Sequence, residues 1–137
     1  MISFYYELPF ALQEEALSAH WLSQLIEAEN KKLGEVTYVF CTDEYLLEHN
    51  IKYLKHNTLT DIISFDYSMG NLISGDIFIS VDRVKENAAT YEVSMDEELH
   101  RVMAHGVLHY CGYKDKTKEE KLLMREKEDY YLSLRTF

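Results

Sequence analysis

The sequence predicts an α+β domain in which a small, four-stranded mixed sheet packs against about five helices. Short β-branched and aromatic runs alternate with segments of helical periodicity in the first half of the chain, and the last third is helical in pattern throughout. No linker, repeat or change of composition divides the 137 residues, a length typical of one domain. We therefore expect residues 1–137 to form a single domain.

Two strands and two helices are predicted in the first half. A strand-like run at residues 2–7 precedes the only proline, Pro9. Apolar residues then recur at helical spacing from about residue 11 to residue 32, and Gly34 is expected to stop that helix. Residues 36–41 are β-branched and aromatic, which predicts a strand, and Thr42 or Asp43 is expected to cap a short helix that reaches about residue 53.

Two further strands and three helices follow. Residues 61–66 and 75–81 have the composition of strands, with a turn at residues 69–71 between them. One helix is expected to begin at or beside Asp82. Two more should begin at Ser94-x-x-Glu97 and at Thr117-x-x-Glu120, because both motifs are typical of a capping box.

Composition argues against several classes of protein. The formal net charge is −10, whereas an indiscriminate nucleic-acid binder is expected to have a broad basic surface. No apolar run approaches the roughly 20 residues needed to cross a bilayer, and no basic residue precedes the apolar part of the N-terminus, as it would in a secretory signal. Cys41 and Cys111 are too few for a disulfide framework. A cytoplasmic protein without membrane association is expected.

His105 and His109 predict a metal site. Residues four apart lie on one face of a helix, so both imidazoles can reach the same ion. Gly112 can adopt the left-handed conformation that ends a helix and reverses the chain, which would return Asp115 to the pair. Three protein ligands with an open fourth position are typical of catalytic zinc, so we expect these two histidines and Asp115 to hold one zinc or other divalent ion. The alternative is that Asp115 only caps the helix that begins near Thr117.

The remaining histidines do not share this spacing. Each is expected to be an ordinary surface or hydrogen-bonded residue: His20, His49, His56 and His100. Cys111 follows His109 by two residues, so it should face away from the metal site and pack against neighbouring side chains.

The same segment has the spacing of the metzincin proteases, H-E-x-x-H-x-x-G-x-x-H, with two departures. Gly106 stands where those enzymes have the glutamate that acts as general base, and Asp115 stands in place of the third histidine. A zinc peptidase is therefore an alternative function that the missing glutamate disfavours.

The run H-G-x-L-H-x-x-G-Y, from His105 to Tyr113, resembles the signature of the YbeY family of bacterial endoribonucleases. Other segments are also similar to that family: T-D-I-I-S-F from Thr60, G-D-I-F-I-S from Gly75, Glu98-Leu99, Met124 and Glu128. The resemblance covers roughly residues 43–130. It implies a zincin-like fold, a bound metal and cleavage of single-stranded RNA in ribosomal RNA processing, with precursor rRNA and ribosomal particles as partners.

Two positions depart from the family pattern. Lys114-Asp115 replaces its usual Asp-His, which makes the third ligand a carboxylate, and Leu54 stands where the family commonly has an arginine. An arginine there would hold a phosphate bidentately, which leucine cannot do. Weaker candidates for substrate contacts are Lys52, Lys55, Asp61, Ser64, Lys114 and Lys116. A non-catalytic, metal-binding ribosome-assembly factor is the second alternative function.

Overall fold

The computed structural model describes residues 1–54 and 60–137, without the side chains of residues 49–54. Within them the elements follow the order β1 (Ile2–Tyr6), α1 (Glu15–Ala28), β2 (Lys32–Cys41), α2 (Asp43–Leu54), β3 (Ile62–Asp66), β4 (Leu72–Ser80), α3 (Val81–Thr90), α4 (Met95–Tyr110) and α5 (Lys118–Ser133). The predicted α+β class, with a four-stranded mixed sheet and five helices, is confirmed for the described residues.

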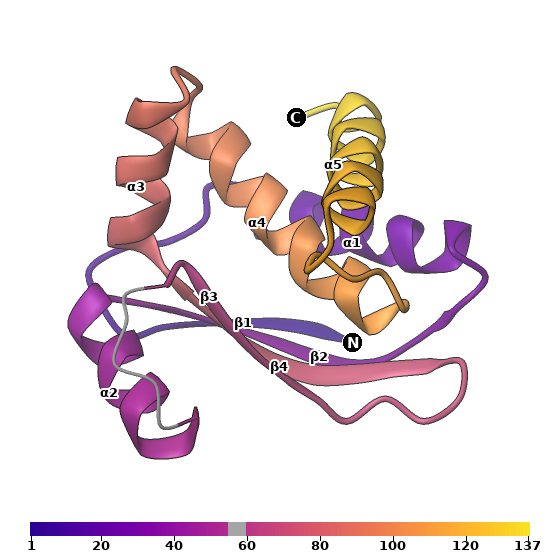
Figure 1. Ribbon diagram of the computed structural model, residues 1–137, viewed down its shortest axis with the longest axis horizontal. Coiled ribbons are helices and arrows are strands. Elements are labelled where there is room, and N and C mark those ends of the chain that lie inside the picture. Colours follow the sequence, from indigo (N-terminus) through magenta and orange to yellow (C-terminus); the bar gives the residue numbers. More distant parts are fainter. Residues whose placement is uncertain (55–59) are drawn as a thin grey trace.

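The sheet has the strand order β1-β2-β4-β3. β1 is parallel to β2 and β2 is parallel to β4, whereas β3 at the edge is antiparallel to β4. Figure 1 shows α1, α3, α4 and α5 on one side of the sheet and α2 on the other. The helix that carries His105 and His109, α4, therefore lies across one face of the sheet.

The main hydrophobic core lies between that face and the helices. Alternate residues of the two central strands are buried in it, among them Tyr38 and Phe40 of β2 and Ile77 and Ile79 of β4. A smaller cluster forms on the opposite face: Cys41, Leu46 and Ile63. Because strand side chains alternate between faces, the central strands can be buried on both sides.

α1 ends earlier than the sequence pattern suggests. Asn30 has a φ of 61°, and its N–H donates to the carbonyl oxygen of Glu27 while the N–H of Lys31 donates to that of Ile26. These are the two hydrogen bonds of a Schellman motif, with asparagine as the left-handed residue. The prediction that the helix continues to residue 32 and stops at Gly34 is wrong, since Gly34 lies inside β2.

Other boundaries differ by a few residues. α1 begins at Glu15 rather than near residue 11, β4 begins at Leu72 rather than at residue 75, and Val81 opens α3 instead of ending the strand. Among the described residues, no helix combines the length and the apolar character that crossing a membrane requires.

Side-chain caps fix the starts of α4 and α5. The hydroxyl of Ser94 accepts a hydrogen bond from the N–H of Glu97. Thr117 and Glu120 form both halves of a capping box. The two helix starts predicted from these motifs are confirmed, and they set where the helices around the site begin.

Candidate metal centre

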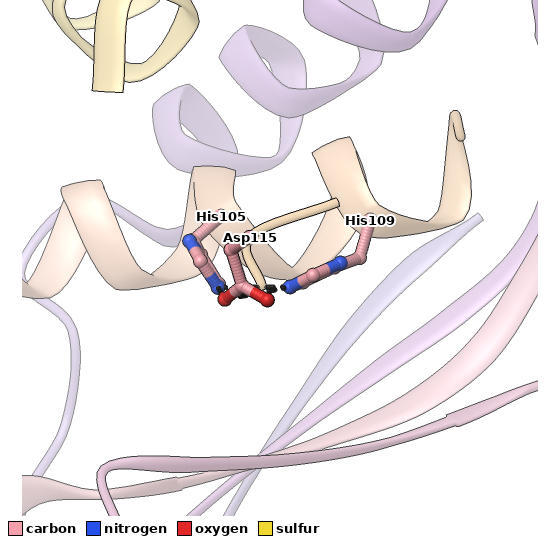
Figure 2. A group of neighbouring side chains, drawn as sticks. All are labelled: His105, His109 and Asp115. Atoms are coloured by element: carbon pink, nitrogen blue, oxygen red, sulfur yellow. Dashed lines mark hydrogen bonds and ion pairs between the residues drawn. The ribbon is translucent and has the colours of Figure 1, made fainter. Parts of the chain in front are cut away.

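His105 and His109 lie one turn apart on α4, and their Nε2 atoms are 3.0 Å from each other. Asp115 returns from the turn after α4, so that its Oδ2 lies 3.2 Å from Nε2 of His105 and 3.3 Å from Nε2 of His109. Figure 2 shows the carboxylate beside the two ring edges. In the described part of the chain, these form the one group of three potential metal-binding side chains this close together.

Gly112 produces the chain reversal that brings Asp115 back. Its φ is 110°, and its N–H donates to the carbonyl oxygen of His109 while the N–H of Tyr113 donates to that of Leu108. α4 therefore also ends in a Schellman motif, here with glycine as the left-handed residue. The conformation predicted for Gly112 is confirmed.

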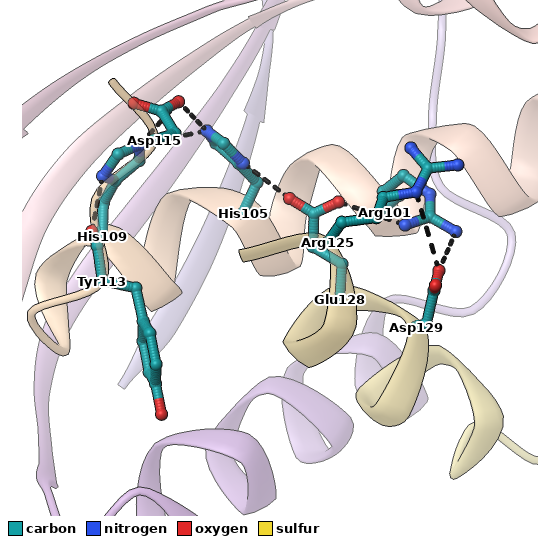
Figure 3. A network of polar contacts seen from close by, with 8 residues as sticks. All are labelled: Arg101, His105, His109, Tyr113, Asp115, Arg125, Glu128 and Asp129. Atoms are coloured by element: carbon teal, nitrogen blue, oxygen red, sulfur yellow. Dashed lines mark hydrogen bonds and ion pairs between the residues drawn. The ribbon is translucent and has the colours of Figure 1, made fainter. Parts of the chain in front are cut away.

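Each histidine ring is held by a hydrogen bond at Nδ1, as Figure 3 shows. Nδ1 of His105 lies 2.7 Å from Oε2 of Glu128, and Nδ1 of His109 lies 2.9 Å from the carbonyl oxygen of Tyr113. Because an ionised carboxylate and a carbonyl only accept, both Nδ1 atoms carry protons. In the neutral form of each ring, Nε2 then presents a lone pair. These lone pairs converge with the Asp115 carboxylate, an arrangement that a cation would stabilise.

Glu128, on α5, is the partner that the sequence did not assign to the site. Its side chain is 7% exposed, and it also accepts a hydrogen bond of 3.1 Å from Nη1 of Arg101. Burial alone would lower the pKa of His105. The hydrogen bond and the charge of Glu128, together with the charges of Asp115 and Asp61, outweigh burial and raise that pKa.

The three side chains open into a pocket of about 460 Å³. Asp61 and Ser64 line it, so the structure brings both of these predicted contact residues beside the histidines. Arg101 and Arg125 also line it, although the sequence pattern pointed to neither. Their positions depend on how α4 and α5 pack, and the sequence contains no short motif that indicates this packing.

Of the predicted lysine contacts, the two that the structure describes in full, Lys114 and Lys116, do not line this pocket. Lys114 lines a separate hollow with Glu29 and Cys111, and Lys116 is exposed. The side chain of Lys52 and the whole of Lys55 lie outside the described residues.

The donor set fits a divalent metal ion. In a tetrahedral zinc site with nitrogen and oxygen ligands at about 2.0–2.1 Å, neighbouring donor atoms lie about 3.3 Å apart. The three donor atoms here are separated by 3.0, 3.2 and 3.3 Å. Two imidazoles and a carboxylate are ligands that zinc accepts, and each histidine makes the outer Nδ1 hydrogen bond that is typical of a metal ligand.

His20, His100 and Cys111 lie away from the site. His100 is buried, with Nε2 2.9 Å from Oγ of Ser18 and Nδ1 2.8 Å from the carbonyl oxygen of Asp96. His20 is exposed, and Cys111 packs against the hydrophobic core. Two histidine side chains fall outside the described ones: His49 and His56.

Two alternatives that the sequence left open lose support: that Asp115 only caps a helix, and that the protein is a zinc peptidase. The hydroxyl of Thr117 caps α5 by accepting from the N–H of Glu120, so the helix does not depend on Asp115 as a cap. Gly106 faces the sheet, where an added Cβ would lie 2.9 Å from Cδ1 of Ile77. A larger side chain at this position, such as the glutamate that serves as general base in metzincins, would have to displace Ile77 and would point at the sheet.

Comparisons with known proteins point to one family. A sequence model described as Endoribonuclease YbeY matches residues 9–135. The chain is 59% identical over 134 residues to the Endoribonuclease YbeY of Flavobacterium psychrophilum and 57% identical over 134 residues to that of Flavobacterium johnsoniae. Both alignments cover 98% of this chain and 96% of the relative. The solution structure of TM1509 from Thermotoga maritima is similar with a TM-score of 0.73 and 25% identity, covering 97% of this chain and 87% of that one.

Proposed function

Because the chain belongs to the Endoribonuclease YbeY family, we propose that it is a metal-dependent endoribonuclease that cleaves single-stranded RNA during ribosomal RNA processing. Its proposed partners are precursor rRNA and ribosomal particles in the cytoplasm. The observation that carries the metal dependence is the convergence of two histidine lone pairs and one carboxylate at 3.0–3.3 Å, at the edge of a pocket.

The proposed ligands are His105, His109 and Asp115, and the proposed ion is one Zn²⁺ per chain. When bound, a divalent ion supplies Lewis-acid chemistry for hydrolysis of a phosphodiester. The chain prepares its own donors: Glu128 and the carbonyl of Tyr113 hold the ring protons on Nδ1, so that both Nε2 atoms stay free to bind.

The charge of the pocket also supports a bound cation. Among the side chains that the structure describes, six charged ones line it: the acids Asp61, Glu98, Asp115 and Glu128, and the bases Arg101 and Arg125. When all are ionised, two negative charges remain unbalanced, and such a pocket repels a phosphodiester. A divalent cation would neutralise this excess, which is how an acidic protein can accept an RNA strand here.

An RNA cleavage assay tests this function. We expect a structured rRNA fragment to be cut in its single-stranded regions, a chelator to stop the cutting, and added Zn²⁺ to restore it. His105→Ala should abolish cleavage, whereas His20→Ala, at an exposed position outside the pocket, should leave it unchanged. Cleavage that resists both the chelator and His105→Ala would contradict the metal role. Metal and ribosome binding without any cleavage would instead favour the non-catalytic assembly factor.

A further inference from the structure

Glu98 is a buried carboxylate with no hydrogen-bond or ion-pair partner among the described residues. It lies on α4 two turns before His105, is 5% exposed, and lines the same pocket. Its carboxylate makes no hydrogen bond or ion pair with any residue in the described part of the chain. No fully enclosed polar side-chain atom among those residues lacks a hydrogen-bond partner, so the oxygens of Glu98 must reach the space of the pocket.

The neighbouring arginines do not neutralise Glu98 by direct pairing. Arg101 uses Nη1 on Glu128 and Nη2 on Asp129, at 3.1 and 2.7 Å, and Figure 3 shows Arg125 turned toward the same Asp129. Burial raises the pKa of Glu98, although the charges of Arg101 and Arg125 act in the other direction. A buried carboxylate that lacks a hydrogen-bond partner is stabilised by any ligand that brings N–H donors to it.

Two side chains from the end of α3 line the pocket as well. Tyr91 is the C-cap residue of α3 and is 57% exposed, and Asn87 lies one turn before it. Residues 91–94 join α3 to α4, so Tyr91 and Glu98 stand on either side of the same short connection, and both line the pocket. An exposed aromatic face beside polar groups is the arrangement on which proteins stack an unpaired base of RNA.

We propose that this end of the pocket is a subsite for a guanine base of the RNA strand, with Glu98 accepting its N1–H and N2–H groups and Tyr91 stacking on its ring. The inference rests on the proposed endoribonuclease function. Guanine is the one common RNA base whose Watson–Crick edge presents two adjacent N–H donors, which match the two oxygens of a carboxylate. The other bases set an acceptor beside their donor, and a carboxylate repels that acceptor. Asn87 can donate to O6 of the same base.

The subsite lies close enough to the metal centre to act on the same strand. Glu98 and His105 are seven residues apart on α4, and seven residues of α-helix rise about 10 Å. Stacked nucleotides advance about 3.4 Å each along a strand. The recognised guanine would therefore lie within about three nucleotides of the bond that is cut.

Sequencing the cleavage products of a randomised single-stranded RNA library tests the subsite. At one position near the cut, we expect guanine to raise kcat/KM by about ten-fold over adenine for the parent protein. Glu98→Gln replaces one acceptor by an amide donor, the pairing that suits adenine, so the preference should switch from guanine to adenine. Zinc content and melting temperature should not change, because glutamine has nearly the same shape.

A second pair of variants separates stacking from the hydroxyl group. Tyr91→Phe keeps the aromatic face and should keep the preference, whereas Tyr91→Leu should raise KM several-fold for substrates with guanine at that position. A preference for guanine that survives Glu98→Gln would overturn the assignment.

Different results would contradict the proposed function and the proposed subsite. Metal-dependent cleavage with no base preference would overturn the subsite alone, whereas no cleavage by the parent protein would overturn both. Binding of free guanosine 5′-monophosphate is measured as well, because the subsite could take its guanine from a free nucleotide instead of from RNA. If it binds as tightly as a guanine-containing trinucleotide and cleavage shows no preference, the site would belong to a free nucleotide and the RNA assignment would be wrong.

Discussion

Nδ1 of His105 lies 2.7 Å from Oε2 of Glu128, although the two residues are 23 positions apart in the chain. The same carboxylate accepts from Arg101, which extends to Asp129. α5 thus fixes the orientation of a ring that α4 carries. A carboxylate at the outer nitrogen of a histidine sets its tautomer and strengthens the inner nitrogen as a metal ligand.

The first prediction follows from this pair. Glu128→Gln should lower zinc affinity about 10- to 100-fold, because the amide keeps the shape but loses the charge that supports His105. Competition with a chromogenic chelator measures the change. Asp129→Asn is the matched control, since Asp129 contacts Arg101 but not His105. Equal losses in the two variants would assign the effect to Arg101 instead.

The second prediction concerns the turn that returns Asp115. Gly112→Val should weaken zinc binding and cost about 1–2 kcal/mol of stability, because a left-handed φ is unfavourable for a residue with a Cβ. Gly70→Val is the control: both glycines have positive φ, 110° and 58°, and at neither would a Cβ meet another atom within 4 Å.

Gly70 lies in the turn between β3 and β4, away from the histidines. Its substitution should therefore destabilise the fold without changing zinc affinity in a titration of the folded protein. Undiminished zinc affinity in folded Gly112→Val would show that the chain can reverse without a left-handed glycine.

Short-range patterns in the sequence predict most elements of this fold. His105 and His109 share a helix face because of their spacing, and Thr117 with Glu120 marks the start of α5 through a motif four residues long. The end of α1 differs from the prediction because two residues, Asn30 and Gly34, are of types that take the left-handed conformation. Periodicity alone does not choose Asn30 over Gly34. The pairing of β2 with β4 from Lys32 onward makes that choice, and β1 joins β2 from Val36.

The parts of the site that the sequence did not predict depend on contacts between distant segments. Glu128 and Arg125 reach the pocket because α5 packs along α4, and neither residue belongs to a motif with His105. The role of Gly106 also depends on a contact between segments that are distant in the sequence. Its sequence position suggests a missing catalytic base, while in the structure it lies where α4 packs closely against Ile77 of the sheet.

The third prediction concerns the dependence of stability on pH at His100. Burial lowers the pKa of this histidine, and the charge of Arg135 adds to the effect, while the carbonyl and carboxylate of Asp96 act against it. The rings of Trp21 and Phe137 pack against it edge-on. The folded protein therefore protonates His100 at lower pH than the unfolded chain, whose histidines have a pKa of about 6.5. Its contribution to stability is complete above that value and is lost as pH falls below it.

Urea unfolding at about pH 7.5 and about pH 5.5 checks this sign. His100→Gln should cost about 1–3 kcal/mol at the higher pH, through the lost hydrogen bonds, and the cost should shrink at the lower pH. His20→Gln, at an exposed position, should follow the parent protein at both pH values. A cost of His100→Gln that grows on acidification would show that the folded state favours the charged ring.

The last prediction tests the third proposed ligand. Oδ2 of Asp115 lies 3.2 and 3.3 Å from the two histidine Nε2 atoms. Asp115→Ala should lose most bound zinc, whereas Asp115→His should keep it, because zinc accepts imidazole as readily as carboxylate. Oxygen ligands suit Mn²⁺ better than imidazole does, so Asp115→His should also favour Zn²⁺ over Mn²⁺ more strongly than the parent protein. Titrations with both ions measure this, and Glu119→Ala controls for the loss of one exposed acid. If Asp115→Ala binds zinc as tightly as the parent, Asp115 is no ligand and another group must fill the third position.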